Sequence, residues 1–171
     1  MKGDHARFKP AILVFALFVL LQFGTGVLLY VNKIGLHPAD TLEYYVGSEA
    51  MLKVYPGRPD RFKQPRTFMG LAKFAMAHFA AFGIICFILA HLLRSLGKAV
   101  DKLPLADGIS LALFALALLD VLSGFLVRYG PPWTAHARIG VFALFTLLGV
   151  LASAMLAAMV FRAPSNPADG R

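Results

Sequence analysis

The chain has 171 residues, of which 58% are hydrophobic and 15% are charged, and its formal net charge is +8 at pH 7. Soluble domains carry about 25% charged residues, so the composition excludes an intrinsically disordered chain and argues against a soluble domain. The basic residues flank apolar blocks instead of forming one face, which favours contact with lipid headgroups over nucleic-acid binding. The single cysteine, Cys86, cannot form a disulfide bond within the chain.

Four apolar blocks reach the length of roughly 20 residues that a membrane-crossing helix requires. They cover about residues 10–32, 70–93, 108–127 and 139–161. None shows the alternation of apolar and polar residues that is typical of a membrane β-barrel, and the first is too long for the apolar core of a signal peptide. We therefore predict one all-α domain over residues 1–171, an integral membrane four-helix bundle, with a disordered tail at 163–171.

The basic residues near the spans predict the orientation of the bundle. Lys2, Arg7 and Lys9 precede the first span, whereas only Lys33 follows it closely. The third span also has more basic residues before it than after it. By the positive-inside rule, we expect a multi-pass protein of the inner membrane with both termini in the cytoplasm. The second span favours the opposite orientation, but the first span usually dominates.

The segment 34–69 is then the one long loop, and it lies on the outer side. Pro38 fits the first turn of a helix, and Asp40 fits an early turn. Apolar residues follow at three- and four-residue spacing. We therefore expect a short amphipathic helix on the membrane surface, with Tyr44 and Tyr45 at the level of the lipid headgroups.

Ionisable side chains inside the spans are functional candidates, because each costs about 2.5–3.5 kcal/mol on insertion scales. The candidates within or next to the spans are Gln22, Lys73, His78, His91, Asp120, Ser123 and His136. At 1.5 Å per residue, His78 and Asp120 lie roughly 10–12 Å below the outer edge of the bilayer. His136 enters the membrane from that same side, whereas His91 lies near the inner edge.

Two imidazoles on facing helices can bind a haem iron from both sides, and a four-helix bundle provides this geometry. We therefore predict a haem b site in the outer half, with His78 and His136 as the iron ligands. Basic residues at the outer edge are candidates to bind the haem propionates. They are Arg66, Lys73, Arg128 and Arg138.

Each candidate also has a structural interpretation. His78 could form a hydrogen bond between helices, as polar residues of membrane bundles do, and His136 could lie at the interface without binding iron. Asp120 could pair with Lys73 or form hydrogen bonds to Ser123 and Gln22, or it could orient a ligand histidine or accept a proton.

A second haem is a further alternative. His78 and His91 are 13 residues apart, which is roughly 20 Å along a helix and enough to separate two haems. Thirteen steps of about 100° place them about 140° apart around the helix axis, so they do not share a face. Met155 and Met159 lie at a suitable depth to ligate iron together with His91. We favour one haem, with two as the alternative.

The four-span plan, the stretch "AHFAAFGIICFILAHLL" and the "HARIG" that opens the last span resemble one known family. This family comprises the small four-helix membrane b-type cytochromes, such as the cytochrome b subunits of formate dehydrogenases and membrane hydrogenases. The resemblance implies electron transfer between haem b, a quinone pool and a redox partner. It also implies histidine ligands at both ends of one span, here His78 and His91, and a ligand from the last helix, here His136.

The sequence thus predicts a membrane-embedded haem b electron-transfer subunit of a larger redox complex, with a quinone as a further candidate ligand. Other subunits would dock on loop 34–69, which carries five basic residues. Catalysis by side chains is not expected, because no nucleophile stands beside a base and the metal centre would perform the redox chemistry. The alternative is a cofactor-free membrane anchor or accessory subunit. A proton-coupled transporter fits less well, because the spans show no repeats or broken helices.

Overall fold

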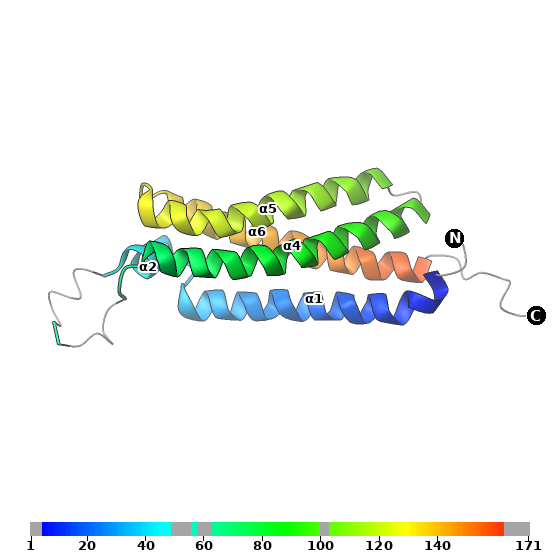
Figure 1. Cartoon of the computed structure of the whole chain (residues 1–171), viewed down its shortest axis with the longest axis horizontal. Coiled ribbons are helices and arrows are strands. Elements are labelled where there is room, and N and C mark those ends of the chain that lie inside the picture. Colours follow the sequence, from blue (N-terminus) through cyan, green and yellow to red (C-terminus); the bar gives the residue numbers. More distant parts are fainter. Residues whose placement is uncertain (1–4, 49–55, 58–62, 100–102, 163–171) are drawn as a thin grey trace, which may run out of the picture.

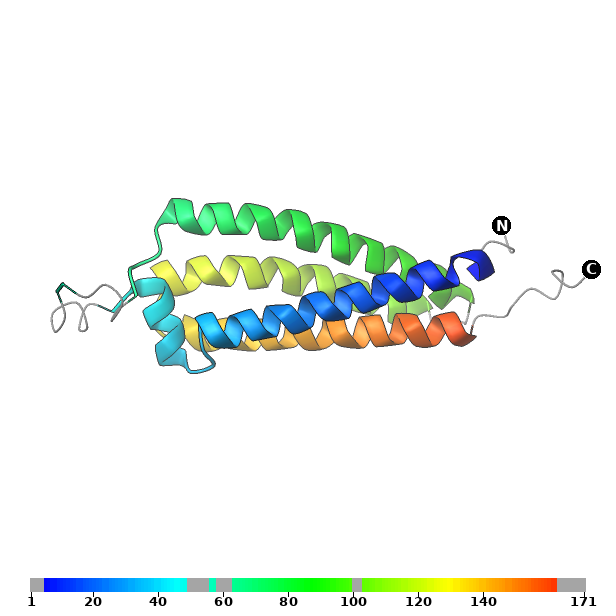
Figure 2. The same ribbon diagram turned by 90° about the horizontal axis from the view of Figure 1, so that it is seen from below.

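The computed structural model describes residues 5–48, 56–57, 63–99 and 103–162. Their helices are α1 (His5–Lys33), α2 (Pro38–Val46), α4 (Phe68–Ala99), α5 (Leu103–Tyr129) and α6 (Thr134–Arg162). The four long helices run side by side, and the short helix α2 lies across one end of them (Figures 1 and 2). The first turns of α1 and the last turns of α6 lie at the opposite end. The predicted all-α four-helix bundle, with a short helix in its long loop, is confirmed.

Each long helix extends beyond the apolar block that predicted it. The block at 139–161, for example, belongs to a helix that spans Thr134–Arg162. The hydroxyl of Thr134 donates a hydrogen bond to the carbonyl oxygen of Pro131 at 2.6 Å, which fastens the start of α6. The helix therefore begins before its hydropathy rises, and Arg138 lies inside it. The tail predicted to be disordered lies outside the described residues.

Large apolar side chains are exposed along all four long helices. Examples are Phe18 at 66% exposed, Met76 at 72%, Leu111 at 74% and Phe161 at 76%. Soluble proteins do not expose apolar surface on this scale, whereas a lipid bilayer is its natural solvent. Each of the four helices is also long and apolar enough to cross a membrane. The chain is a multi-pass membrane protein whose outer surface contacts lipid.

Helix α6 is the central helix of the bundle, because it packs against α1, α4 and α5. Helix α5 in turn packs against α4, so α1 and α4 stand at the two ends of this series of contacts (Figure 2). The main apolar core fills the half of the bundle away from α2, and Leu89, Leu93, Leu113 and Leu156 are fully buried there. In the other half, the bundle is less tightly filled and contains a cavity.

Gly149 of α6 lets Phe23 of α1 approach the helix backbone. A Cβ atom at Gly149 would overlap the Phe23 ring, whereas a Cβ at Gly140 in the same helix would meet no described atom within 4 Å. We expect Gly149→Ala to lower the free energy of unfolding by about 1–3 kcal/mol through overpacking. Gly140→Ala should be neutral or raise it by up to about 1 kcal/mol. Thermal unfolding in detergent measures both, and equal effects would contradict the close approach.

Helix α2 caps the end of the bundle, where it contacts α5 and α6. Its Thr41 and Tyr45, one turn apart, are 0% and 3% exposed. Gly124 of α5 leaves room for the phenol ring, because a Cβ there would lie 3.2 Å from Cε1 of Tyr45. Tyr45, which was expected beside the lipid headgroups, is therefore covered by the bundle and does not face lipid. The face of α2 that carries Tyr45 packs against α5 and α6.

Backbone hydrogen bonds fasten the end of the long loop to α2. The Ser48 amide donates to the Lys63 carbonyl at 3.0 Å, and the Arg66 amide donates to the Tyr45 carbonyl at 3.0 Å. Nε of Arg128 in α5 donates to the Arg66 carbonyl oxygen at 2.8 Å. These three bonds hold Arg66 beside the bundle end.

Candidate functional site

A cavity of about 490 Å³ lies between α1 and α4 in the half of the bundle next to α2. Five aromatic rings form much of its apolar wall, those of Phe23, Phe74, Phe82, Phe142 and Phe145. Its polar groups come from every long helix and include Gln22, Tyr30, His78, Asp120 and Arg138. A mostly apolar cavity with a few converging polar groups is the usual form of a small-molecule site.

His78 is held in one orientation at the α4 side of the cavity. Its Nδ1 lies 2.9 Å from the carbonyl oxygen of Phe74, one turn earlier in α4. Because a carbonyl oxygen only accepts, Nδ1 carries the proton, and Nε2 of the neutral ring is left as an acceptor or metal ligand. The Phe74 ring stacks on the imidazole with centroids 3.7 Å apart, and Phe82 meets it edge-on at 5.2 Å.

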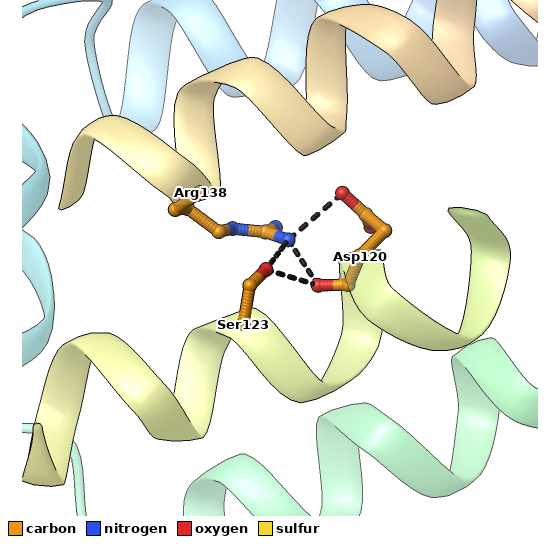
Figure 3. Close-up of polar contacts among 3 residues, drawn as sticks. All are labelled: Asp120, Ser123 and Arg138. Carbon is orange, nitrogen blue, oxygen red and sulfur yellow. Dashed lines mark hydrogen bonds and ion pairs between the residues drawn. The ribbon is translucent and has the colours of Figure 1, made fainter. Parts of the chain in front are cut away.

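Asp120 and Arg138 form a buried ion pair between α5 and α6, with 2.8 Å between Oδ1 and Nη1 (Figure 3). Nη1 of Arg138 also donates to the Ser123 hydroxyl oxygen at 2.8 Å and to the backbone carbonyl oxygen of Asp120. The two charged side chains are only 5% and 3% exposed. The pair therefore joins two helices at the cavity wall and adds no net charge there.

Of the partners suggested for Asp120, Ser123 donates its hydroxyl to the Asp120 backbone carbonyl at 2.8 Å, but Lys73 is not its ion-pair partner. Lys73 is exposed and does not line the cavity, and Asp120 pairs with Arg138. Arg138, which was expected among the free cations at the outer edge, is 3% exposed because α6 begins at Thr134 and Arg138 lies one turn inside the helix. It still lines the cavity. The need of a buried carboxylate for a cation was the signal that could have found it.

The structure does not bring His136 and His78 together. His136 is exposed and is not among the residues that line the cavity. His136 stands two residues before Arg138. Two residues correspond to a rotation of about 200° around the helix axis, so His136 points outward when Arg138 points inward. His91 is also exposed, beside Phe87 at 6.5 Å between ring centroids. The described ranges hold no group of three or more His, Cys, Asp or Glu that could bind a metal ion.

Of the four cations predicted for propionates, Arg66 and Arg138 line the cavity, and Arg138 is already paired with Asp120. The guanidinium Cζ of Arg66 lies 4.2 Å from the centre of the Tyr44 ring, which fixes its position at the α2 end. Lys33 lines the same region, although the sequence analysis did not assign it a role. Arg128 uses its Nε to hold the Arg66 backbone. The α2 end of the cavity therefore carries two basic side chains.

Tyr30 is a cavity residue that the sequence analysis missed. Its ring stacks on that of Phe142 with centroids 3.9 Å apart, and Cζ of Arg138 lies 5.6 Å from its centre. Only its position near the end of the first apolar block could have drawn attention to it.

Tyr45 of α2 lies close to Arg138, and burial raises the pKa of the Tyr45 hydroxyl above the ordinary value. Tyr45 therefore stays neutral at physiological pH.

A family model described as a transmembrane helical domain, Aq_1264_TM, matches residues 35–167. The matched range includes α2, α4, α5 and α6, and with them His78, Asp120 and Arg138. The description states a membrane fold and specifies no ligand or reaction. No curated protein and no solved structure matches the chain.

Proposed function

We propose that this chain, which belongs to the Aq_1264_TM family of transmembrane helical domains, is an electron-transfer subunit of a larger membrane redox complex. In this proposal the cavity between α1 and α4 binds one haem b. The orientation of His78 is the observation that carries the proposal. Its Nδ1–H is taken by the Phe74 carbonyl oxygen, and its Nε2 is left for iron beside an aromatic cavity.

The residues of the cavity fit a haem with one axial histidine. The phenylalanine rings offer apolar surface to a flat macrocycle, and Arg66 and Lys33 at the α2 end offer charge-assisted hydrogen bonds to two propionates. The exposed positions of His136 and His91 give no support for either as a ligand at this cavity. We therefore assign His78 as the histidine ligand of a single haem.

The chemistry of the bound haem would be one-electron exchange, and the protein would set its environment. The Phe74 carbonyl holds the tautomer and ring plane of His78. The Asp120–Arg138 pair places a polar but neutral wall nearby. A quinone is a second candidate ligand of this cavity, because its carbonyl oxygens accept hydrogen bonds and its ring packs on phenylalanine.

Other subunits would dock at the α2 end, where the long loop returns to the bundle. Arg66 is exposed there, and its backbone is fastened by Tyr45 and Arg128. Most of the basic residues of the loop lie outside the described residues. In the orientation that the flanking charges predict, this end faces away from the cytoplasm.

An absorption spectrum of the purified full chain tests the proposal. The chain is expressed with a haem precursor, purified in mild detergent and measured before and after dithionite reduction. We expect a haem b spectrum that sharpens on reduction, with one haem per chain. A folded chain that shows no haem band, even after incubation with hemin, would contradict the proposal.

One observation favours a second candidate, a cofactor-free anchor or accessory subunit. Nη1 of Arg138 is bound by Asp120 and Ser123 without any ligand, as interhelical polar contacts in membrane bundles are. The same spectrum separates the two candidates. An anchor would purify with its partner subunits and remain colourless.

A further inference from the structure

Three deeply buried polar atoms lack a hydrogen-bond partner within the part of the chain that the structure describes. They are Oη of Tyr30, Oγ1 of Thr41 and Nε of Arg138. Their residues are 4%, 0% and 3% exposed. Buried polar groups in native proteins are nearly always paired with protein or with ordered water, because an unpaired one loses its hydration without compensation. The three atoms therefore need an explanation.

The three atoms belong to one junction, where α1, α2 and α6 meet. Cζ of Arg138 lies 5.6 Å from the centre of the Tyr30 ring. The hydroxyl of Thr41 lies close enough to that of Tyr30 to interact with it, but neither makes a hydrogen bond of ordinary length and angle. Helix α2, which carries Thr41, packs against α6, which carries Arg138. A shared partner can therefore reach groups from all three helices.

We propose that ordered water binds at this junction and bridges Tyr30, Thr41 and Arg138. The chemistry of the three atoms suits water, because the guanidinium Nε–H donates and each hydroxyl can both donate and accept. Buried waters typically make about three hydrogen bonds to otherwise unpaired groups. An ion is not required, because Arg138 already has the carboxylate of Asp120 as its counter-charge.

This water site connects the α2 end of the bundle with the cavity. Tyr30 and Arg138 line the cavity, whereas Thr41 and Tyr45 belong to the helix that caps the bundle. A bound water there would therefore touch both the helix that caps the bundle and the wall of the cavity, whether or not the cavity holds haem.

Removal of single hydroxyl groups tests the proposal by the sign of the effect. Thr41→Val and Tyr30→Phe each delete one partner of the water and keep the shape of the side chain. With bound water, we expect each variant of the full chain in detergent to lower the unfolding midpoint by about 2–4 °C. The double variant should lower it by less than the sum, because both hydroxyls hold the same water. Tyr44→Phe is the control, since the Tyr44 ring stacks on Arg66, and it should leave the midpoint unchanged.

A dry junction in which the hydroxyls stay unpaired predicts the opposite sign. Deleting an unpaired buried hydroxyl then leaves the midpoint unchanged or raises it, and this result would overturn the proposal. A density map of the full chain at a resolution that shows water gives the second readout. We expect a peak within hydrogen-bonding distance of at least two of the three atoms, and a direct Tyr30–Thr41 hydrogen bond without such a peak would refute it. If Thr41→Val fails to fold, Tyr30→Phe and the map still decide.

Discussion

Replacement of His78 by alanine should abolish haem binding while the bundle remains folded. The side chain is half-buried at the cavity wall and makes one hydrogen bond, to a carbonyl oxygen in its own helix, so its loss removes the ligand without breaking a contact between helices. The measurement is the haem content per chain from the reduced absorption spectrum, with circular dichroism as the check on folding. Imidazole added to the His78→Ala variant should restore part of the haem signal, because the cavity left behind can admit the free ligand.

The chain offers two matched controls for this experiment. His136→Ala and His91→Ala remove exposed histidines that do not line the cavity, and both variants should keep full haem content. Full haem retention in His78→Ala would remove the ligand assignment. Haem loss in His136→Ala with intact folding would show that α6 is rotated relative to the structure described here.

Arg138→Leu should lower the free energy of unfolding by about 3–5 kcal/mol, because it leaves the buried carboxylate of Asp120 without its counter-charge. The double variant Arg138→Met with Asp120→Leu should recover most of this loss, since apolar residues of similar size often replace a buried ion pair at little cost. Unfolding in mixed detergent micelles, followed by circular dichroism, measures all three proteins.

An exposed ion pair of the same chain provides the comparison. Nε of Arg94 lies 3.3 Å from Oδ1 of Asp107, but the side chains are 69% and 46% exposed. Arg94→Ala should therefore cost no more than about 1 kcal/mol. If Arg138→Leu proved no more damaging than Arg94→Ala, the buried pair would not be a structural link between α5 and α6.

The sequence alone determined the number of spans and the short helix between the first two. The bilayer sets the length of an apolar block, so the four helices could be predicted from hydropathy. Pro38 and Asp40 marked the start of α2 because the first turn of a helix tolerates proline and favours acidic residues. His78 and Asp120 could be selected as candidates because any ionisable group inside the membrane is costly.

Only the tertiary structure decided which side chains meet. In lipid, the surface that faces the bilayer is as apolar as the surface that faces the core, so hydropathy does not reveal how each helix is rotated. The sequence could not show that Arg138 faces Asp120 while His136, two residues away, faces outward. Nor could it show that α1 packs on α6 and leaves a cavity beside α4, because that choice depends on close contacts such as Phe23 on Gly149.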